Sequence, residues 1–239
     1  MNKNVLILGG SSDIGIEVIK IFIKNEYSIT AHCNSNNKSL VKICKEYKKI
    51  KVIKKDFSNL NDIKLNKFCA QRFNVKYSIF INLVGYMEKK SYLKSDLNSL
   101  IKSIKINSLV PALILKNILK KMIKGRYGRI LNCSSIGVKF GGGLNSYNYS
   151  FSKHASEFIP SIFKDLAEKN IIYNNLRIGF TKTKIHKKVK SNSDLKKRTS
   201  LIPIKRAADK KEIAEYIYFL VNQKNSYMTN EIINVSGGE

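Results

Sequence analysis

The sequence predicts an α/β fold built on a doubly wound, parallel sheet of about seven strands, and three observations point to it. Short apolar runs alternate with longer amphipathic stretches along all 239 residues. A glycine-rich segment follows the first apolar run and opens a helix. Polar motifs come directly after the predicted strands, at the sheet edge where such folds bind ligands. Residues 1–239 are expected to form a single domain.

The expected strands are short, apolar runs rich in β-branched residues, and they cover residues 5–8, 28–33, 50–54, 77–84, 129–133, 171–178 and 231–235. The spacing of apolar residues predicts helices from residue 14 and over 38–47, 60–68, 97–122, 149–168 and 209–221, with a kink at Pro160. Residues 184–204 have weak periodicity and many lysines. This excursion is expected to cover a substrate.

The bulk composition argues against several classes of protein. The apolar runs are far shorter than the roughly 20 residues of a membrane-spanning helix, and no export signal is recognisable, so we expect a cytoplasmic protein without a membrane partner. The four cysteines and three histidines lack a zinc-binding spacing. Reduced thiols and no metal site are therefore expected.

The net charge of +27 has more than one interpretation. Lysines are scattered through every segment, and Lys, Ile and Asn, whose codons are AT-rich, are abundant together, so genome composition is a sufficient explanation. An acidic protein or a phosphate-bearing partner is the alternative. A nucleic-acid partner is not expected, because neither a nucleic-acid-binding module nor a clustered basic face is visible.

The segment after the first strand combines glycines with small polar residues, in the order Gly9, Gly10, Ser11, Ser12, Asp13, Ile14 and Gly15. Glycine permits a tight turn and a close backbone approach to a pyrophosphate, while the following helix N-terminus supplies N–H donors and a positive dipole. At the first strand–helix turn, this pattern predicts a dinucleotide-binding Rossmann fold. Asp13 could cap the helix, although its carboxylate also brings negative charge near the phosphates.

Tyr149 and Lys153 lie four residues apart and therefore share one face of a helix. A phenol with a pKa near 10 is a poor acid–base group at neutral pH, and an ammonium group one turn away stabilises the phenolate. The pair predicts a tyrosine that exchanges a proton with a carbonyl or alcohol oxygen. Tyr147 is a rival tyrosine, but its partner four residues on is Phe151, which cannot tune it.

These motifs, in order and over nearly the whole chain, resemble the short-chain dehydrogenase/reductase family. The family loop Thr-Gly-x-x-x-Gly-x-Gly keeps Gly9 and Gly15 here, with Leu8 and Asp13 at two other positions. The resemblance implies that the dinucleotide is bound by Gly9, Ser11, Ser12, Asp13, Ile14, Gly15, Asn34, Asp56, Phe57, Asn82, Val84, Gly85, Tyr149, Lys153, Gly179, Thr181 and Thr183.

The same resemblance implies a catalytic centre of Asn107, Ser135, Tyr149 and Lys153. Aligning the fifth strand selects Ser135, whereas counting back from Tyr149 selects Ser134; we favour Ser135 because strand register fixes which side chain faces the cleft. Ser135 would bind the carbonyl oxygen and Tyr149 would supply the proton. Lys153 would lower the pKa of Tyr149 and hold the nicotinamide ribose, and Asn107 would position Lys153 through water.

The coenzyme preference depends on the stretch after the second strand. NAD sites usually place a carboxylate there to bind the ribose hydroxyls, but residues 31–38 contain none. Asn34 and Ser35 can donate to a 2′-phosphate and Lys38 is near, although Ser12 replaces the usual basic residue of the glycine loop. NADP is therefore expected, and NAD stays possible.

The expected substrate is a small carbonyl or alcohol compound. The general resemblance is to 3-oxoacyl-(acyl-carrier-protein) reductases, which implies an acidic carrier protein docked near Arg126 and Lys169. A sugar, polyol or nucleotide-sugar substrate is the alternative, and a non-catalytic dinucleotide-binding protein is a hypothesis of another class. The resemblance also implies a homotetramer or homodimer formed through the helices that bear Asn107 and Tyr149.

Overall fold

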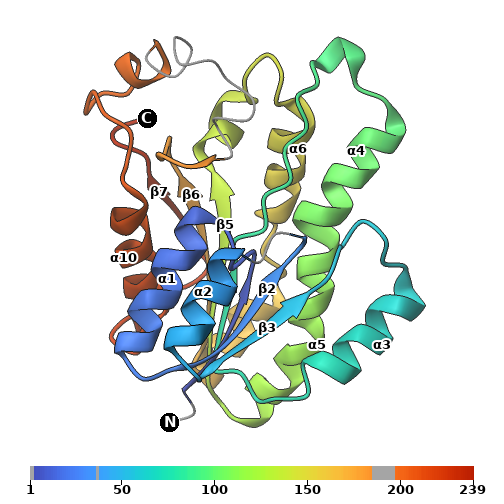
Figure 1. Cartoon of the computed structure of the whole chain (residues 1–239), viewed down its shortest axis with the longest axis vertical. Helices are drawn as coiled ribbons and strands as arrows, with labels where there is room; N and C mark the ends of the chain where they lie inside the picture. The colour runs from blue at the N-terminus through green and yellow to red at the C-terminus, as the bar shows by residue number, and fades with distance from the viewer. Residues whose placement is uncertain (1–2, 36–37, 185–196) are drawn as a thin grey trace.

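A computed structural model describes residues 3–35, 38–184 and 197–239. These residues form one parallel sheet of seven strands in the order β3-β2-β1-β4-β5-β6-β7 (Figure 1). The strands are β1 (Asn4–Leu8), β2 (Ser28–Cys33), β3 (Ile50–Lys54), β4 (Ile79–Asn82), β5 (Gly128–Ser135), β6 (Ile171–Ile178) and β7 (Ile232–Val235). The predicted α/β Rossmann fold with about seven strands is confirmed.

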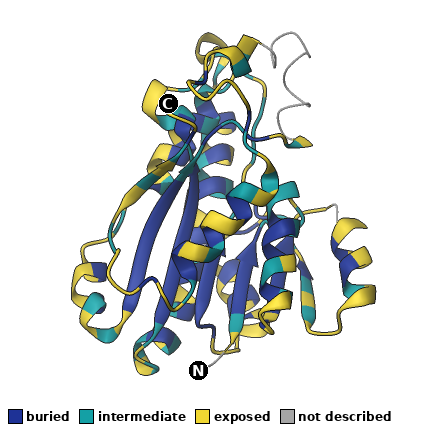
Figure 2. Ribbon diagram, turned by 90° about the vertical axis from the view of Figure 1, so that its left-hand side faces the viewer, coloured by how far each residue is buried: buried dark blue, intermediate teal, exposed yellow. Residues whose placement is uncertain are grey.

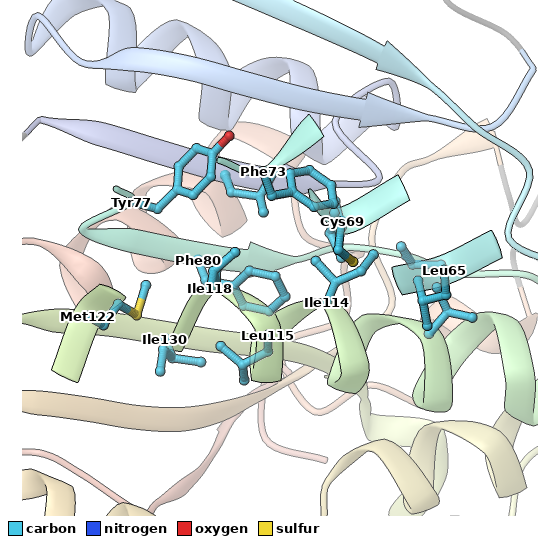
Figure 3. Packing of buried hydrophobic residues seen from close by; sticks show 14 of the residues in the cluster. Leu65, Cys69, Phe73, Tyr77, Phe80, Ile114, Leu115, Ile118, Met122 and Ile130 are labelled. Carbon is cyan, nitrogen blue, oxygen red and sulfur yellow. The ribbon is translucent and has the colours of Figure 1, made fainter. Parts of the chain in front are cut away.

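Helices cover both faces of the sheet, and each face has its own apolar core. One layer holds α1 (Asp13–Lys24), α2 (Lys38–Glu46) and α10 (Lys210–Val221), whose apolar residues pack on one side of the strands. The other holds α3 (Asp62–Arg72) and α5 (Val110–Lys124), together with α7 (Ile162–Leu166). Figure 2 shows the central strands buried between these layers. In Figure 3, Phe80 of β4 lies against Ile114 and Ile118 of α5.

The strand order reverses between β1 and β4. The chain passes from β1 to β2 and β3 on one side, and then returns to place β4 beside β1 on the other. Ligands of doubly wound sheets bind beyond the carboxyl ends of the strands at such a reversal. The loops after β1 and β4 are therefore the expected walls of a binding site.

Capping side chains set where several helices begin. Ser12 is the N-cap of α1, because its Oγ accepts a 3.0 Å hydrogen bond from the N–H of Gly15. Asn61 caps α3 in the same way, accepting from Lys64 at 2.9 Å. The prediction of a helix over 60–68 was wrong at both ends, because Asn61 starts the helix and the apolar spacing alone does not mark its end at Arg72.

The long predicted helix over 97–122 contains an irregular turn. It consists of α4 (Leu97–Ile104), a π-helical turn η2 (Lys105–Leu109) and α5. Pro111 has no N–H and cannot donate to the carbonyl four residues earlier, which belongs to Asn107. Isolated π-helical turns often occur at functional sites, and this one contains a predicted catalytic residue.

The predicted helix over 149–168 is interrupted rather than kinked. α6 (Tyr147–Ser156) is followed by five residues outside any helix, then by α7 and a short 3-10 helix, η4 (Ala167–Lys169). Pro160 cannot donate to the carbonyl of Ser156, and that carbonyl instead accepts a hydrogen bond from Asn132 at 2.8 Å. The end of α6 is thus attached to the sheet.

Most of the predicted excursion, 185–196, lies outside the described residues. After β6, a parallel bridge joins Thr181 to Ala208, with a 3.0 Å hydrogen bond from Lys182 to the Ala208 carbonyl. None of the helices in the described ranges is both long and apolar enough to cross a membrane.

Candidate active site

A cleft of about 1410 Å³ opens at the carboxyl ends of the strands. Its wall contains most of the predicted coenzyme-binding residues, namely Gly9, Ser11, Ser12, Asp13, Ile14, Asn34, Asp56, Phe57, Val84, Gly85, Tyr149, Lys153, Gly179, Thr181 and Thr183. Ser135 lies in the same wall. The structure therefore gathers residues from six strand ends around one cavity, as the position of the motifs predicts.

Gly15, Asn82 and Asn107 lie behind this wall rather than in it. Asn82 accepts a 3.1 Å hydrogen bond from the N–H of Val84 and so shapes the turn after β4. A Cβ atom on Gly15 would lie 2.7 Å from the carbonyl oxygen of Gly10, so only glycine lets α1 start this close to the loop. These residues support the cleft from behind.

The glycine loop has the shape that a dinucleotide requires. Gly9 has φ +74°, and a Cβ there would lie 2.7 Å from the carbonyl oxygen of Leu83. The loop therefore packs against the turn after β4 and leads into the N-terminus of α1, where N–H groups and the helix dipole favour an anion. The residues present fit the pyrophosphate of a nicotinamide dinucleotide.

The Asp13 carboxylate turns toward the start of the excursion. Its Oδ2 accepts a 2.7 Å hydrogen bond from the backbone N–H of Lys184, and Oδ1 lies 3.8 Å from the Lys184 ammonium. Ser12 caps the helix instead. The expected repulsion between Asp13 and a bound phosphate is reduced, because the Lys184 ammonium lies near the carboxylate.

His32 is a wall residue that the sequence suggested to be only part of a strand. Its ring stacks on Phe57, with centroids 4.1 Å apart. Nδ1 accepts from the N–H of Gly9 at 3.4 Å, and Nε2 then donates to the Lys55 carbonyl at 2.8 Å. Burial lowers the pKa of His32 to about 4, so the neutral ring joins the glycine loop to the end of β3. The sequence signal that could have placed His32 in the site is its position at the carboxyl end of β2, the strand beside β1.

Tyr149 and Ser135 meet at the floor of the cleft. The hydroxyl of Ser135 accepts from the N–H of Gly137 at 3.2 Å and also bonds to the Tyr149 side chain. Ser134 instead directs its Oγ toward the carbonyl of Lys153, at 3.5 Å. Burial raises the pKa of Tyr149 to about 12, although the Ser135 hydrogen bond acts in the opposite direction. Tyr149 is therefore a neutral phenol, which is a proton donor.

The Lys153 ammonium is fixed by backbone carbonyls rather than directed at Tyr149. Its Nζ donates to the carbonyls of Val84 at 2.7 Å and Cys133 at 2.6 Å. Burial lowers the pKa of Lys153 to about 8. The expected lowering of the Tyr149 pKa by Lys153 is not found, because desolvation raises this pKa and the group that acts against it is Ser135.

Asn107 holds two segments of the site together. Its Oδ1 accepts from the N–H of Tyr86 at 2.7 Å, and its Nδ2 donates to the Tyr86 carbonyl at 2.9 Å and to Ser152 Oγ at 2.8 Å. Ser108 also donates to the Ser152 carbonyl. The π-helical turn is therefore hydrogen-bonded to α6 next to Lys153. The side chains of Asn107 and Lys153 are not hydrogen-bonded to each other directly.

Among the described residues, the wall near the end of β2 carries no carboxylate before Asp56. Asn34, Ser35, Ser39 and Lys55 line it. Lys38, named from the sequence as a nearby cation, lies outside this wall, and Lys55 takes that place. These hydrogen-bond donors and the lysine can bind an additional phosphate group.

The opposite part of the wall combines Lys197 and Arg198, basic residues of the predicted excursion, with groups that sequence reasoning missed. Arg198 forms an ion pair with Glu239, and its guanidinium lies over the Phe180 ring, 5.8 Å from the centroid. Apolar residues surround this end, namely Met87, Ile136, Phe140, Leu144 and Leu201. Lys89, Lys139 and Lys197 add positive charge. Ile136, Phe140 and Leu144 lie between Ser135 and Tyr149 in the sequence, but no motif marks them.

Arg126 and Lys169 lie away from the cleft. Arg126 donates to the carbonyl of Glu168 at 3.5 Å, and Lys169 lies 4.0 Å from the Glu168 carboxylate. Both come just before β5 or β6 begins, so they lie at the amino ends of the strands. Within one chain they do not border the cavity.

Across the described ranges, no group of three or more His, Cys, Asp and Glu side chains could hold a metal ion.

Comparison with known proteins defines the class. A family model described as enoyl-(acyl carrier protein) reductase matches residues 9–239. The chain therefore belongs to the short-chain dehydrogenase/reductase family, whose members are NAD(P)-dependent oxidoreductases.

Two curated relatives have the same name, 3-oxoacyl-(acyl-carrier-protein) reductase FabG. The protein from Aquifex aeolicus is 34% identical over 182 residues, which is 75% of this chain and 73% of the relative. The protein from Buchnera aphidicola subsp. Schizaphis graminum is 30% identical over 246 residues, which is 99% of this chain and 96% of the relative.

Solved structures share the fold over the whole chain. A structure of ElxO with NADP bound has a TM-score of 0.84 at 25% identity and covers 100% of this chain and 98% of that one. A 4-hydroxyisoleucine dehydrogenase mutant complexed with NADH and succinate has a TM-score of 0.88 at 23% identity and covers 99% and 98%.

Proposed function

We propose that the chain is an NADP-dependent reductase of 3-oxoacyl thioesters, with Tyr149 as the proton donor. One observation carries the proposal: a neutral, half-buried phenol that bonds to Ser135 lines a cleft whose wall also contains the glycine loop. A pKa above neutrality keeps the proton on Tyr149, and the protonated phenol is the form that donates to a carbonyl oxygen. The bound coenzyme supplies the hydride.

Each protein group has a separate role. Ser135 donates to the carbonyl oxygen and stabilises the charge that develops on it. Tyr149 transfers its proton to the same oxygen. Lys153, fixed by the carbonyls of Val84 and Cys133, places a positive charge beneath the reacting groups and binds the ribose. Asn107 acts through Ser152, because it fixes the turn of α6 between Tyr149 and Lys153.

The coenzyme is assigned from the residues at the adenosine end. Gly9, Ser11, Ser12 and the first turn of α1 would hold the pyrophosphate, with Thr181 and Thr183 on the other side. Asp56 and Phe57 would contact the adenine. Asn34, Ser35 and Lys55 would bind a 2′-phosphate, which supports NADP over NAD. The ElxO structure, which contains NADP, is consistent with this choice.

Two observations support a thioester substrate. The FabG relatives carry the name of that activity at 34% and 30% identity. The substrate end of the cleft combines apolar side chains with Lys89, Lys139 and Lys197, which suits an acyl chain joined to an anionic arm. A carrier protein would have to approach this mouth of the cleft, because Arg126 and Lys169 lie at the amino ends of the strands, away from the cleft.

One observation favours a second candidate, a reductase of a sugar, polyol or nucleotide sugar. Glu239 lies in the wall, and its Oε2 is buried without a hydrogen-bond partner among the described residues. A hydroxyl group of a polar substrate would satisfy this acceptor.

A substrate panel separates the candidates. NADPH oxidation is followed at the nicotinamide absorbance band with an acetoacetyl thioester, the matching enoyl thioester, and a nucleotide-linked keto sugar. The proposal predicts the highest kcat/KM with the acetoacetyl thioester. Reduction of the enoyl thioester or the keto sugar alone would contradict it.

The assembly and compartment belong to the same proposal. Exposed apolar side chains occur along the adjacent elements α4, η2 and α6, namely Leu97, Ile101, Leu109 and Phe151, with Phe158 just beyond. We propose that copies of the chain associate through these helices as a homotetramer or homodimer. The four free cysteines support a reducing, cytoplasmic location.

A further inference from the structure

The helix that carries Tyr149 and Lys153 ends within one turn of Lys153, and its last carbonyls are bound by side chains of the sheet. Asn132 of β5 donates to the carbonyl of Ser156 at 2.8 Å. Asn175 of β6 donates to the carbonyl of Glu157, also at 2.8 Å. Because both asparagines are buried on central strands, they fix the end of α6 relative to the sheet.

The two donors belong to a row of three asparagines across β4, β5 and β6. Asn82, Asn132 and Asn175 are in register on adjacent strands. Asn82 Nδ2 donates to Asn132 Oδ1 at 2.8 Å, and Asn132 Nδ2 donates to Asn175 Oδ1 at 2.8 Å. Buried amides are costly unless they are hydrogen-bonded. Once satisfied, such a network gives a rigid support.

Glu157, the first residue after α6, forms a bidentate ion pair with Arg177 of β6. The two hydrogen bonds measure 2.8 and 2.7 Å. The Glu157 side chain is 4% exposed and that of Arg177 is 19% exposed. The desolvation of such a pair often cancels its attraction, so stability alone is a weak reason for its presence.

Glu157 lies four residues after Lys153, and therefore one helical turn away. Burial lowers the pKa of Lys153 to about 8, whereas the Cys133 thiol and the Glu157 carboxylate raise it. Tyr149 is the other titratable group on this face of α6. Arg177 faces Glu157 from β6 and holds its carboxylate in one orientation.

We propose that Glu157, held by Arg177, is a positioning residue for Lys153: it fixes the last turn of α6 and places a carboxylate one turn from the ammonium. The inference rests on the proposed function, because it assigns a part in catalysis to Lys153.

Three variants test the pair, with kinetics as the first readout. In Glu157→Gln, the kcat for carbonyl reduction is expected to fall about tenfold while both KM values change by less than about twofold. Arg177→Met frees the carboxylate to move and is expected to lower kcat as well. Glu212→Gln is the matched control, because it breaks a bidentate pair with Arg206 on the exposed side of α10 and is expected to retain activity.

The double variant Glu157→Gln/Arg177→Met separates positioning from stability. It removes both buried charges, so its thermal midpoint is expected to recover relative to Glu157→Gln. Its kcat is expected to stay low, because the negative charge near Lys153 is still missing. Recovery of kcat together with the thermal midpoint would overturn the proposal.

A second readout does not depend on turnover. Lysine is labelled with ¹³C at Cε, and the Lys153 signal is identified by its loss in Lys153→Met. Its titration midpoint is expected to be lower in Glu157→Gln than in the parent protein and unchanged in Glu212→Gln. An unchanged midpoint in Glu157→Gln would overturn the proposal. If the parent protein reduces no carbonyl compound, the proposed function fails, and this titration still decides whether Glu157 acts on Lys153.

Discussion

The Asp13 carboxylate, in the first turn of α1, accepts a 2.7 Å hydrogen bond from the backbone N–H of Lys184, at the start of the excursion after β6. The two residues are 171 positions apart, and they join opposite walls of the cleft. Asp13 thereby combines two effects on coenzyme binding. It anchors the segment after Thr183, and it places a negative charge near the pyrophosphate site.

Asp13→Asn separates these effects. The amide oxygen still accepts from Lys184, but the negative charge is lost, so NADPH is expected to bind about fivefold more tightly, which is about 1 kcal/mol. Asp13→Ala loses the anchor too and should bind less tightly than Asp13→Asn. Titration of nucleotide fluorescence measures both. Weaker binding by Asp13→Asn than by the parent protein would show that the charge itself assists binding.

His32 should make the free energy of unfolding depend on pH. Its pKa is about 4 in the folded protein and near 6.5 when unfolded, so the unfolded chain binds more protons between these values. The contribution of His32 is therefore present above about pH 6.5 and is lost as the pH falls toward 4, by up to about 3 kcal/mol. His32→Phe retains a ring against Phe57 and should show a smaller loss in urea unfolding over this range. Equal losses in both proteins would contradict the neutral, buried ring.

The residues after β2 should set the coenzyme preference. NADPH is expected to bind more tightly than NADH, because Asn34 and Ser35 can donate to a 2′-phosphate and no carboxylate opposes it. Asn34→Asp introduces a charge that repels this phosphate and accepts from ribose hydroxyls, so it should reverse the order. Dissociation constants for both nucleotides provide the measurement. Tighter binding of NADH by the parent protein would refute the assignment.

An aspartate on α4 should disrupt the proposed assembly. Ile101 is 49% exposed on α4, and Ile101→Asp would place a charge in an apolar contact between copies. Light scattering is expected to give the mass of a dimer or tetramer for the parent protein and of one chain for the variant. Ile63→Asp, at a site 80% exposed on α3, is the control and should keep the larger mass. A parent protein with the mass of one chain would contradict the proposed association of copies through α4.

The strands were predictable because they are short, buried and bounded by polar residues. The ranges 28–33, 50–54 and 171–178 agree with β2, β3 and β6 at both ends. Site residues that follow such strands directly, such as Ser135, were predictable for the same reason. Strand register decides which hydroxyl meets Tyr149, and the structure engages the Ser134 hydroxyl with the Lys153 carbonyl instead.

Features that depend on contacts distant in sequence were not predictable. Pro160 indicated a kink, but whether a helix bends or stops depends on what binds its free carbonyls, and Asn132 and Asn175 supply those donors. The orientation of Asp13 depends on Lys184 in the same way. Helical spacing placed Tyr149 and Lys153 on one face, but it could not show that two carbonyls engage the ammonium.

The most direct test of the account is the turnover of Tyr149→Phe. Phenylalanine fills the same space without a proton to donate, so the kcat for NADPH-dependent reduction should fall by about 10² to 10⁴ while the dissociation constant for NADPH stays within about twofold. Tyr147→Phe, two residues away, is the control and should remain active. Near-parental kcat in Tyr149→Phe would contradict the assignment of this phenol as the proton donor.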